Sequence, residues 1–269
     1  MVAYHSDDHL AGCLASIGRS FEVLVVDNDA SDATRDIATA HGADYVASPH
    51  NVGFAAAVNI GLDKAWDWER DVLLLNPDAR VTAADVVALQ EALYEPGTHR
   101  AAVGPGLVGS DGSAQRAQWP VPSPGQVWVD AFGLSRWWRG RHFVVGAVLL
   151  LSGAALVELG RFDERYFLYA EEADWQLRAQ RAGWSVQVVD GVVATHEGAA
   201  SSSVASTREQ LFLASGEQFG RRWYGRLGWL VMRVGSLVAA LRRSFVGTPA
   251  SRERNRRAVR FYLTGSTDR

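Results

Sequence analysis

The sequence is short of cysteine, and it contains no long uninterrupted apolar run. The single cysteine, Cys13, excludes an internal disulfide and agrees with a reducing compartment. The most hydrophobic stretch, residues 143–159, is slightly too short to span a bilayer, and Gly146, Gly153 and Glu158 interrupt it. No charged and then apolar leader with a cleavage site opens the chain. We therefore expect a cytoplasmic protein.

Several motifs that define enzyme classes are also missing. The chain has no Gly-x-x-x-x-Gly-Lys loop for phosphates and no Gly-x-Ser-x-Gly nucleophile elbow. Its histidines and its one cysteine lack the spacing of a structural zinc site. These absences argue against a P-loop nucleotidase, an α/β-hydrolase and a zinc finger.

Basic residues are scarce until the last fifth of the chain. Residues 1–220 hold 15 Lys and Arg against 28 Asp and Glu, whereas residues 221–269 hold 12 against 2. An acidic body with an arginine-rich tail indicates an anionic partner for the tail, either a membrane surface or nucleic acid. Nucleic acid is disfavoured because no recognition motif accompanies the charge.

The tail combines this charge with an apolar stripe at helical spacing, which predicts amphipathic helices. Such a helix lies in a membrane interface, or it packs on the domain as a terminal helix; the pattern alone leaves both open. A further arginine cluster at residues 252–260 suits anionic lipid or a lipid-linked pyrophosphate. The apolar positions are Leu227, Leu230, Val231, Val234, Leu237, Val238 and Leu241.

The rest of the chain predicts an α/β fold. With 269 residues, 48% hydrophobic and 21% charged, it is an ordinary globular protein. Short apolar strands alternate with helices, which indicates βαβ units and a mostly parallel, Rossmann-like sheet flanked by helices. The predicted strands are 21–26, 44–47, 72–75 and 101–104, and the predicted helices are 32–41 with Ser31 as N-cap, 53–68, and 82–94 with a capping box.

The second half of the chain is less regular. We predict a hairpin tip at residues 109–113, a loop or flap with four tryptophans at 119–142, and a buried strand that ends near Leu151. A short helix then begins near Gly153. The predicted elements that follow are a helix over 171–182, closed by Gly183, and two strands over 185–189 and 192–195.

Asp78 is the first candidate functional residue. It follows the apolar strand 72–75 through the turn Asn76-Pro77, so its carboxylate lies at the carboxyl end of a strand. Ligands bind at this edge in open α/β sheets, and a carboxylate there suits a divalent metal that bridges phosphates. The alternative is an ordinary polar turn. His196 ends the last predicted strand and is a plausible second ligand, or a hydrogen-bonded surface residue.

Three carboxylates, Glu171, Glu172 and Asp174, open the predicted helix 171–182. Acidic residues are common in a first helical turn, where the helix dipole stabilises them. Here, however, aromatic neighbours surround them with apolar surface, which raises a carboxylate's pKa and strengthens it as a base. A third unusual segment begins at Asn51: Gly53 opens a helix, and Asn59 and Gly61 lie inside that helix against their propensity. The alternative for Gly61 is close helix packing.

Taken in order, a set of motifs resembles family 2 glycosyltransferases, and most closely the bacterial rhamnosyltransferase branch. The resemblance covers about residues 2–200, and it is the order of the motifs that makes it specific. The first strand, Met1–Tyr4, is shorter than in the family. The motifs are Val25-Val26-Asp27-Asn28, Asn51-Val52-Gly53-Phe54-Ala55, Leu74-Leu75-Asn76-Pro77-Asp78, Gly146-Ala147, Phe162-Asp163-Glu164, Tyr169-Ala170-Glu171-Glu172-Ala173-Asp174-Trp175 and His196.

The resemblance implies a GT-A fold, a divalent metal (Mg²⁺ or Mn²⁺) and inversion at the anomeric carbon. Asp78 corresponds to the last Asp of the family's Asp-x-Asp motif, with Asn76 in place of the first, and His196 to a second metal ligand of some relatives. Glu172 falls at the catalytic base position, and Glu171 and Asp174 stay as alternatives. The residues implied at the nucleotide sugar are Asp27 (on the base), Asn28, Asn51, Gly53, Phe54, Asn59 and Asn76.

The function that we expect is transfer of a sugar, rhamnose from dTDP-rhamnose, to a lipid-linked saccharide in cell-wall or surface polysaccharide synthesis. The donor is dTDP- or UDP-linked, and the enzyme lies on the inner face of the plasma membrane. Residues 1–205 form the GT-A domain, with a nucleotide-binding half to about 105 and an acceptor half to 205, and residues 206–269 form the basic helical region. The alternatives are a catalytically impaired sugar-nucleotide-binding protein and a nucleotidyltransferase.

Overall fold

The structure is a computed structural model, and it describes residues 1–64, 70–198, 205–246 and 248–264. The chain divides into two compact units. Unit 1 consists of Met1–Trp119 and His142–Ala205, and unit 2 of Pro120–Arg141 and Ser206–Arg269. Residues 120–141, which the domain prediction assigns to the acceptor half, therefore group with the carboxyl-terminal helices. The predicted domain boundaries stay a prediction.

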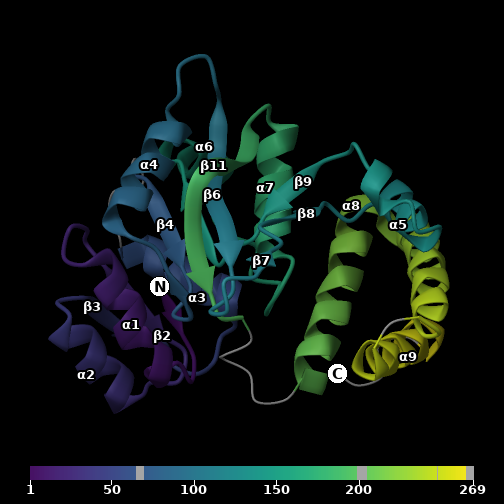
Figure 1. Ribbon diagram of the computed structural model, residues 1–269, viewed down its shortest axis with the longest axis horizontal. Coiled ribbons are helices and arrows are strands. Elements are labelled where there is room, and N and C mark those ends of the chain that lie inside the picture. The colour runs from purple at the N-terminus through teal and green to yellow at the C-terminus, as the bar shows by residue number, and fades with distance from the viewer. Residues whose placement is uncertain (65–69, 199–204, 247, 265–269) are drawn as a thin grey trace. The chain divides into compact units, whose positions relative to one another are not determined.

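Unit 1 contains a small parallel sheet in the order β1-β2-β3, and a larger mixed sheet in the order β4-β10-β6-β11-β5. Figure 1 labels β2 and β3 of the small sheet and β4, β6 and β11 of the larger one. The small sheet comprises β1 (Val2–Ala3), β2 (Leu24–Asp27) and β3 (Asp44–Ala47). The larger one comprises β4 (Val72–Leu75), β5 (Ala79–Arg80), β6 (Arg100–Val108), β10 (Val148–Leu151) and β11 (Ser185–His196), with β7 (Ala114–Gln115) paired to β6. Two further strands, β8 (Gln118–Pro120) and β9 (His142–Val144), pair with each other.

The strand β11 corrects one prediction. We predicted two strands, 185–189 and 192–195, but the chain continues as one strand that pairs in parallel with β6. Its register shifts between Val189 and Val193, where Gly191 has a φ of 80°. A glycine at positive φ accommodates such a bulge without ending the strand.

Helices of unit 1 cover both faces of the larger sheet, except the helix Asp32–Ala40, which packs on the small sheet. This arrangement is the mixed α/β fold that the sequence predicts. Alternate residues of β10 point to opposite sides: Val148 and Leu150 pack with α1 and α4, and Leu149 and Leu151 with α3, α6 and α7. A strand that is buried on both faces needs the continuous apolar run seen here. The helices are α1 (Asp7–Ile17), α2 (Asp32–Ala40), α3 (Phe54–Lys64), α4 (Ala83–Leu93), α6 (Gly153–Leu159) and α7 (Glu171–Arg181).

Helix ends follow the capping signals of the sequence. The Ser31 side chain accepts a hydrogen bond from the backbone N–H of Thr34 at the start of α2, and Thr82 and Asp85 form a complete capping box on α4. The predicted end of α3 at Trp68 lies outside the described residues.

Unit 2 corrects the prediction of a loop over 119–142. This stretch contains a helix, α5 (Pro124–Ala131), and a 3₁₀ turn, η1 (Ser135–Trp137). Ser123 caps α5, and Pro124 occupies the first turn, where proline costs no hydrogen bond. The prolines therefore start a helix rather than prevent one.

The rest of unit 2 consists of α8 (Ala205–Arg243), with a non-helical residue at Gly225, and α9 (Pro249–Thr264). Arg257 pairs with Glu209 at 2.8 Å, and Arg233 donates to the carbonyl of Tyr262 at 2.7 Å, so α9 is tied to both halves of α8. Among the described residues, no helix is both long and apolar enough to cross a bilayer.

Candidate functional site

Asp78 and His196 come together at one edge of the larger sheet. Asp78 follows β4, and His196 is the last residue of β11, which pairs with β5 directly after Asp78. The Nε2 atom of His196 lies 3.6 Å from Oδ1 of Asp78, and the two side chains are only 17% and 12% exposed. The sheet thus brings two predicted metal ligands, 118 positions apart in the numbering, to one place.

The orientation of His196 is fixed by Gln115, a residue that the sequence analysis missed. The amide oxygen of Gln115 lies 3.2 Å from Nδ1 of His196, and its amide nitrogen donates to the His196 carbonyl at 2.8 Å. An amide oxygen only accepts, so this contact places the ring proton on Nδ1 and leaves the Nε2 lone pair directed toward Asp78. No periodicity marks Gln115, because it lies in a two-residue strand, β7, after a hairpin.

This pair fits a divalent cation. Carboxylate oxygen and imidazole nitrogen together suit Mn²⁺, and the carboxylate with phosphate oxygens suits Mg²⁺. In the described part of the chain, no group of three or more His, Cys, Asp and Glu surrounds a common point. Two protein ligands are enough where substrate phosphates and water complete the sphere. Burial raises the pKa of the Cys13 thiol to about 12, and this thiol donates to the Asn76 carbonyl at 3.4 Å.

Glu171 and Glu172 form a second acidic group at the start of α7. Burial, and then the charge of Glu172, raise the pKa of Glu171 well above that of a free glutamate. Burial also raises the pKa of Glu172. In each side chain, Oε2 has no hydrogen-bond partner among the described residues. A buried carboxylate oxygen without a partner is suited to receive a proton.

The turn between β9 and β10 connects the two acidic groups. A Cβ atom at Gly146 would lie 3.8 Å from Cβ and Cγ of Glu172, so this glycine lies against the glutamate. The next residue, Ala147, accepts a hydrogen bond at 2.9 Å from the backbone N–H of Asn76, in the turn that carries Asp78. One turn thus touches both the start of α7 and the Asp78 turn.

Asp174 has a different environment from the two glutamates. It is fully buried, accepts a hydrogen bond from the Tyr166 hydroxyl at 3.2 Å, and pairs with Arg178 at 3.3 Å. A carboxylate that is held in this way stabilises the packing of α7 and has little capacity to take a proton from a ligand. Of the three candidate bases, Asp174 is therefore the least suitable.

Asp27 and Asn28, after β2, are buried in a hydrogen-bonded turn. The carboxylate of Asp27 accepts from the backbone of Asp29 at 2.9 Å, the backbone of Ser31 at 2.8 Å and the Tyr45 hydroxyl at 2.9 Å. The amide of Asn28 donates to the Gly53 carbonyl at 3.2 Å. Both side chains therefore organise the loops at the carboxyl ends of β2 and β3 in the small sheet.

The segment from Asn51 to Asn59 is joined to the loop before α7. Gly53 has a φ of 87°, and a Cβ atom there would lie 2.5 Å from the Phe167 carbonyl, which accepts from Phe54 at 2.7 Å. The amide of Asn59 bonds to both backbone groups of Phe162 and donates to Glu164 at 2.8 Å. These residues are therefore constrained by close packing and by a bridge across more than 100 residues.

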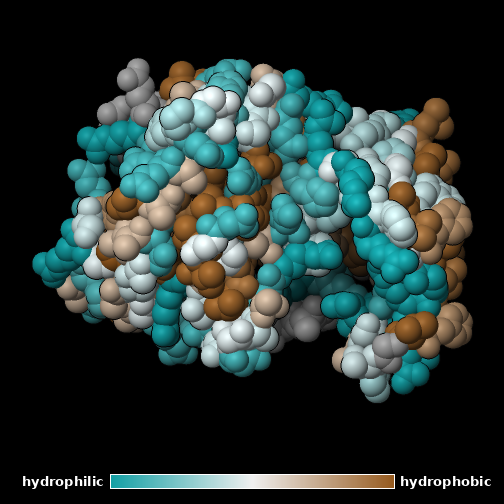
Figure 2. Space-filling view, turned by 45° about the horizontal axis from the view of Figure 1, so that its top comes forward, coloured by the Kyte–Doolittle hydropathy of each residue, from teal (hydrophilic) through white to brown (hydrophobic). Residues whose placement is uncertain are grey.

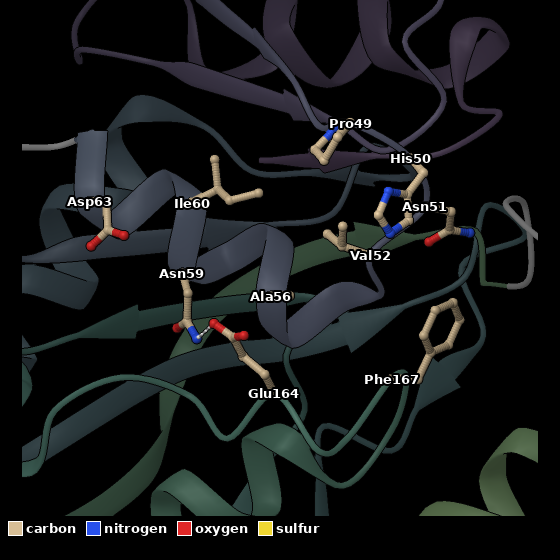
Figure 3. A pocket seen from close by; sticks show the side chains of 10 residues that line it. All are labelled: Pro49, His50, Asn51, Val52, Ala56, Asn59, Ile60, Asp63, Glu164 and Phe167. Atoms are coloured by element: carbon tan, nitrogen blue, oxygen red, sulfur yellow. Dashed lines mark hydrogen bonds between the residues drawn. The ribbon is translucent and has the colours of Figure 1, made fainter.

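A cavity of about 480 Å³ lies beside this bridge (Figure 3). His50 and Phe167 lie at one side of it, and Asn59 points toward Glu164 (Figure 3). Asn51 and Asn59 line it, whereas the lining does not include Asp78, His196 or Glu172. The predicted metal ligands and the predicted base therefore lie outside the cavity that Asn51 and Asn59 line. The lining residues are Pro49, His50, Asn51, Val52, Ala56, Asn59, Ile60, Asp63, Glu164 and Phe167.

Known proteins with similar sequences are glycosyltransferases. Residues 1–126 match the model of glycosyl transferase family 2. The chain is 27% identical to N-acetylglucosaminyl-diphospho-decaprenol L-rhamnosyltransferase of Mycobacterium tuberculosis, over 95% of this chain and 94% of that protein. It is also 25% identical to the low-salt glycan biosynthesis hexosyltransferase Agl10 of Haloferax volcanii, over 71% and 65% of the two chains.

Two solved structures have a similar fold. One is the mannosyltransferase PcManGT from Pyrobaculum calidifontis in complex with GDP-Man and Mn²⁺, with a TM-score of 0.59 and 14% identity over 99% of this chain and 86% of that one. The other is glucosyl-3-phosphoglycerate synthase from Mycobacterium tuberculosis, with a TM-score of 0.55 and 17% identity over 81% and 77%. The chain is therefore a glycosyltransferase with the GT-A fold, and its residues 1–126 match the model of glycosyl transferase family 2.

Proposed function

We propose that this glycosyltransferase is metal-dependent and inverting, and that it transfers rhamnose from dTDP-rhamnose to a lipid-linked saccharide in cell-wall or surface polysaccharide synthesis. The observation that carries the proposal is the meeting of Asp78 with His196, in a turn that is hydrogen-bonded to the β9–β10 turn, whose Gly146 lies against the buried Glu172. The similarity to the mycobacterial N-acetylglucosaminyl-diphospho-decaprenol L-rhamnosyltransferase supports the choice of sugar and acceptor.

The chemistry is a single displacement. An acceptor hydroxyl oxygen attacks the anomeric carbon, the bond from that carbon to the diphosphate oxygen breaks, and the nucleoside diphosphate leaves with the electron pair. Glu172 takes the hydroxyl proton, since its buried oxygen has no other partner in the described chain and its raised pKa makes it a stronger base than a free carboxylate. Inversion requires no second, nucleophilic carboxylate.

Asp78 and His196 are the residues that would hold Mg²⁺ or Mn²⁺. When bound there, a divalent cation supplies positive charge to the departing diphosphate. Gln115 keeps His196 in the orientation and tautomer that this role requires.

The nucleotide part of the donor is assigned to the loops after β2 and β3. We propose that Asp27 meets the base, while Asn28, Asn51 and Gly53 shape the backbone that approaches the nucleotide. We propose that Phe54, Asn59 and Asn76 hold the surrounding loops in place, because they form hydrogen bonds with other parts of the chain. A UDP-linked donor would use the same groups.

Two measurements test this proposal. The first is thermal stability with dTDP- and UDP-sugars, with and without Mn²⁺, since a ligand that binds the folded state must raise its stability. The second is transfer by Glu172→Ala and Asp78→Ala. We expect a metal-dependent shift with a pyrimidine nucleotide sugar and a rate loss of about 10²-fold or more in both variants. Wild-type rates in both variants would refute the site.

We further propose that the enzyme is cytoplasmic and peripheral on the inner face of the plasma membrane, bound there through the basic carboxyl-terminal helices. The support is the net charge of these helices and the exposed apolar stripe of α8, where Leu227 is 80% exposed. Attachment of this kind would place the enzyme beside a lipid-linked acceptor.

A further inference from the structure

The second half of α8 has apolar residues on two faces. One face is buried within the protein and includes Trp229, Met232 and Ala239. The other is exposed and begins at Leu227. Its members recur at intervals of three, four and seven residues, so they form one stripe along the helix. The exposed residues are Leu227, Leu230, Val231, Val234 and Leu241, followed by Phe245 and Val246 just after the helix.

A second set of exposed apolar residues lies where α5 joins η1. Phe132 is 67% exposed, Trp137 is 61% exposed, and Leu134 between them is 47% exposed. Three large apolar side chains exposed within six residues form an apolar patch, and such patches mark interaction sites. Trp137 also lies under the guanidinium of Arg136, 5.2 Å from the ring centre. We call residues 124–137 the α5–η1 hairpin.

The hairpin is fixed to the same end of α8 that carries Phe245. The Asp130 carboxylate pairs with Arg243, and the Asp130 carbonyl accepts from Arg242 at 3.2 Å. A Cβ atom at Gly235 would lie 3.1 Å from Val127, so glycine allows α8 and α5 to approach closely. These contacts bring Phe132, two residues after Asp130, and Phe245, two residues after Arg243, to the same end of α8.

The charge of unit 2 complements an anionic surface. Its sequence contains 16 arginines and 5 acidic residues, a net charge of +11, against −14 for unit 1. Arginines also alternate with the exposed apolar residues: Arg136 and Arg139 beside Trp137, and Arg242 before Phe245. Figure 2 shows hydrophobic residues gathered along one side of unit 2, at the right of the view.

From these observations we infer that the α5–η1 hairpin and the exposed stripe of α8 form one membrane-docking face, which inserts Phe132, Leu134 and Trp137 into the interface of an anionic bilayer. The arginines of the face contact lipid phosphates, and each apolar side chain gains by leaving water. This inference rests on the proposed function, because it supplies the surface on which a lipid-linked acceptor is met.

A second copy of the chain is a less suitable occupant. The centres of protein interfaces are depleted of like charges, and two copies joined through this face would bring Arg136 and Arg242 near their own counterparts. An anionic bilayer offers opposite charge to the same residues.

The experiment is vesicle flotation of the full chain, with phosphatidylglycerol and phosphatidylcholine mixtures compared with phosphatidylcholine alone. The variants are Phe132→Asp and Trp137→Asp. The matched control is Val157→Asp, which adds the same charge at a side chain that is 58% exposed on α6 of unit 1. We expect wild type and the control to float with the anionic vesicles, and each hairpin variant to bind at least about fivefold more weakly. Because these side chains are exposed, melting temperatures should stay unchanged.

Three outcomes would overturn the inference. The first is a Phe132→Asp chain that floats like the control, and the second is equal flotation on neutral and anionic vesicles. The third is light scattering that reveals a dimer broken by Phe132→Asp without any flotation. Transfer to a water-soluble acceptor tests the proposed function separately: a chain that floats as expected but transfers no sugar would refute the transferase reaction and leave the docking face intact.

Discussion

At the scale of single residues, the two glutamates at the start of α7 are distinguished from Asp174 by what each oxygen touches. We expect Glu172→Gln to lower kcat by about 10²–10⁴-fold, with little change in the KM of the donor, because a general base acts only in the transition state. The wild-type rate should rise with pH through the raised pKa of the base. A steady-state pH profile measures this, and a loss in Glu171→Gln but not in Glu172→Gln would contradict the assignment.

We expect the negative charge of Glu171 to destabilise the folded protein. Its pKa is raised in the folded protein, so the folded state binds the proton more tightly than the unfolded state, and stability falls as the pH rises from the ordinary glutamate pKa through the raised one. Glu171→Gln should therefore be more stable than wild type at pH 8, by about 1 kcal/mol or more, or roughly 2–4 °C in Tm. The difference should vanish near pH 4. Thermal melts at both pH values decide it, and a lower Tm at pH 8 would show that the charge is stabilised instead.

Gln115 is expected to act only through His196. Gln115→Ala removes both contacts to His196, and we expect Mn²⁺ to bind about 10–100-fold more weakly. Titration of Mn²⁺ in the presence of a nucleoside diphosphate, monitored by electron paramagnetic resonance, measures this Mn²⁺ affinity without sugar transfer. Gln187→Ala, at an exposed position of β11, is the control. Equal Mn²⁺ affinity in the two variants would remove the positioning role.

At the scale of elements, the join between α3 and the loop before α7 depends on a residue without a side chain. Gly53→Ala combines a strained φ of 87° with a Cβ only 2.5 Å from the Phe167 carbonyl, whereas Gly97→Ala has a similar φ of 81° and open space around it. The difference between the two variants therefore isolates the clash. We expect Gly53→Ala to cost about 1–3 kcal/mol more than Gly97→Ala in urea unfolding. Equal losses of stability in the two variants would mean that the loop before α7 moves away from the added Cβ atom at no further cost.

At the scale of the whole molecule, charge is divided between the two units of the chain, −14 in unit 1 and +11 in unit 2. If unit 2 binds anionic lipid, transfer to an acceptor embedded in vesicles should fall several-fold between about 0.05 and 0.5 M salt, because salt screens exposed charges. Transfer to a soluble acceptor should change little over that range. Parallel assays measure both, and the same salt dependence for both acceptors would argue against an electrostatic role for unit 2.

The local pattern of the sequence was enough to predict most elements and several candidate residues. Strand β3 and strand β4 begin and end as predicted, and the caps of α2 and α4 use the predicted side chains. These features depend on hydrogen bonds and apolar spacing within a few residues, which the sequence displays directly. The prediction failed where proline and tryptophan suggested a loop at 119–142, since a proline in the first turn is equally compatible with a helix.

Tertiary structure decided what local pattern cannot express. The pairing of β5 with β11 brings His196 to Asp78, Gln115 reaches His196 across 81 residues, and Gly146 lies against Glu172. The same three acids of α7 are neighbours in the sequence, yet burial and an arginine partner separate Asp174 from the two glutamates. The sequence by itself therefore determined most helices and strands, and the division of charge between an acidic body and a basic carboxyl-terminal region. Only the folded chain determined which groups share a site, because contacts and burial depend on distance in space and not along the chain.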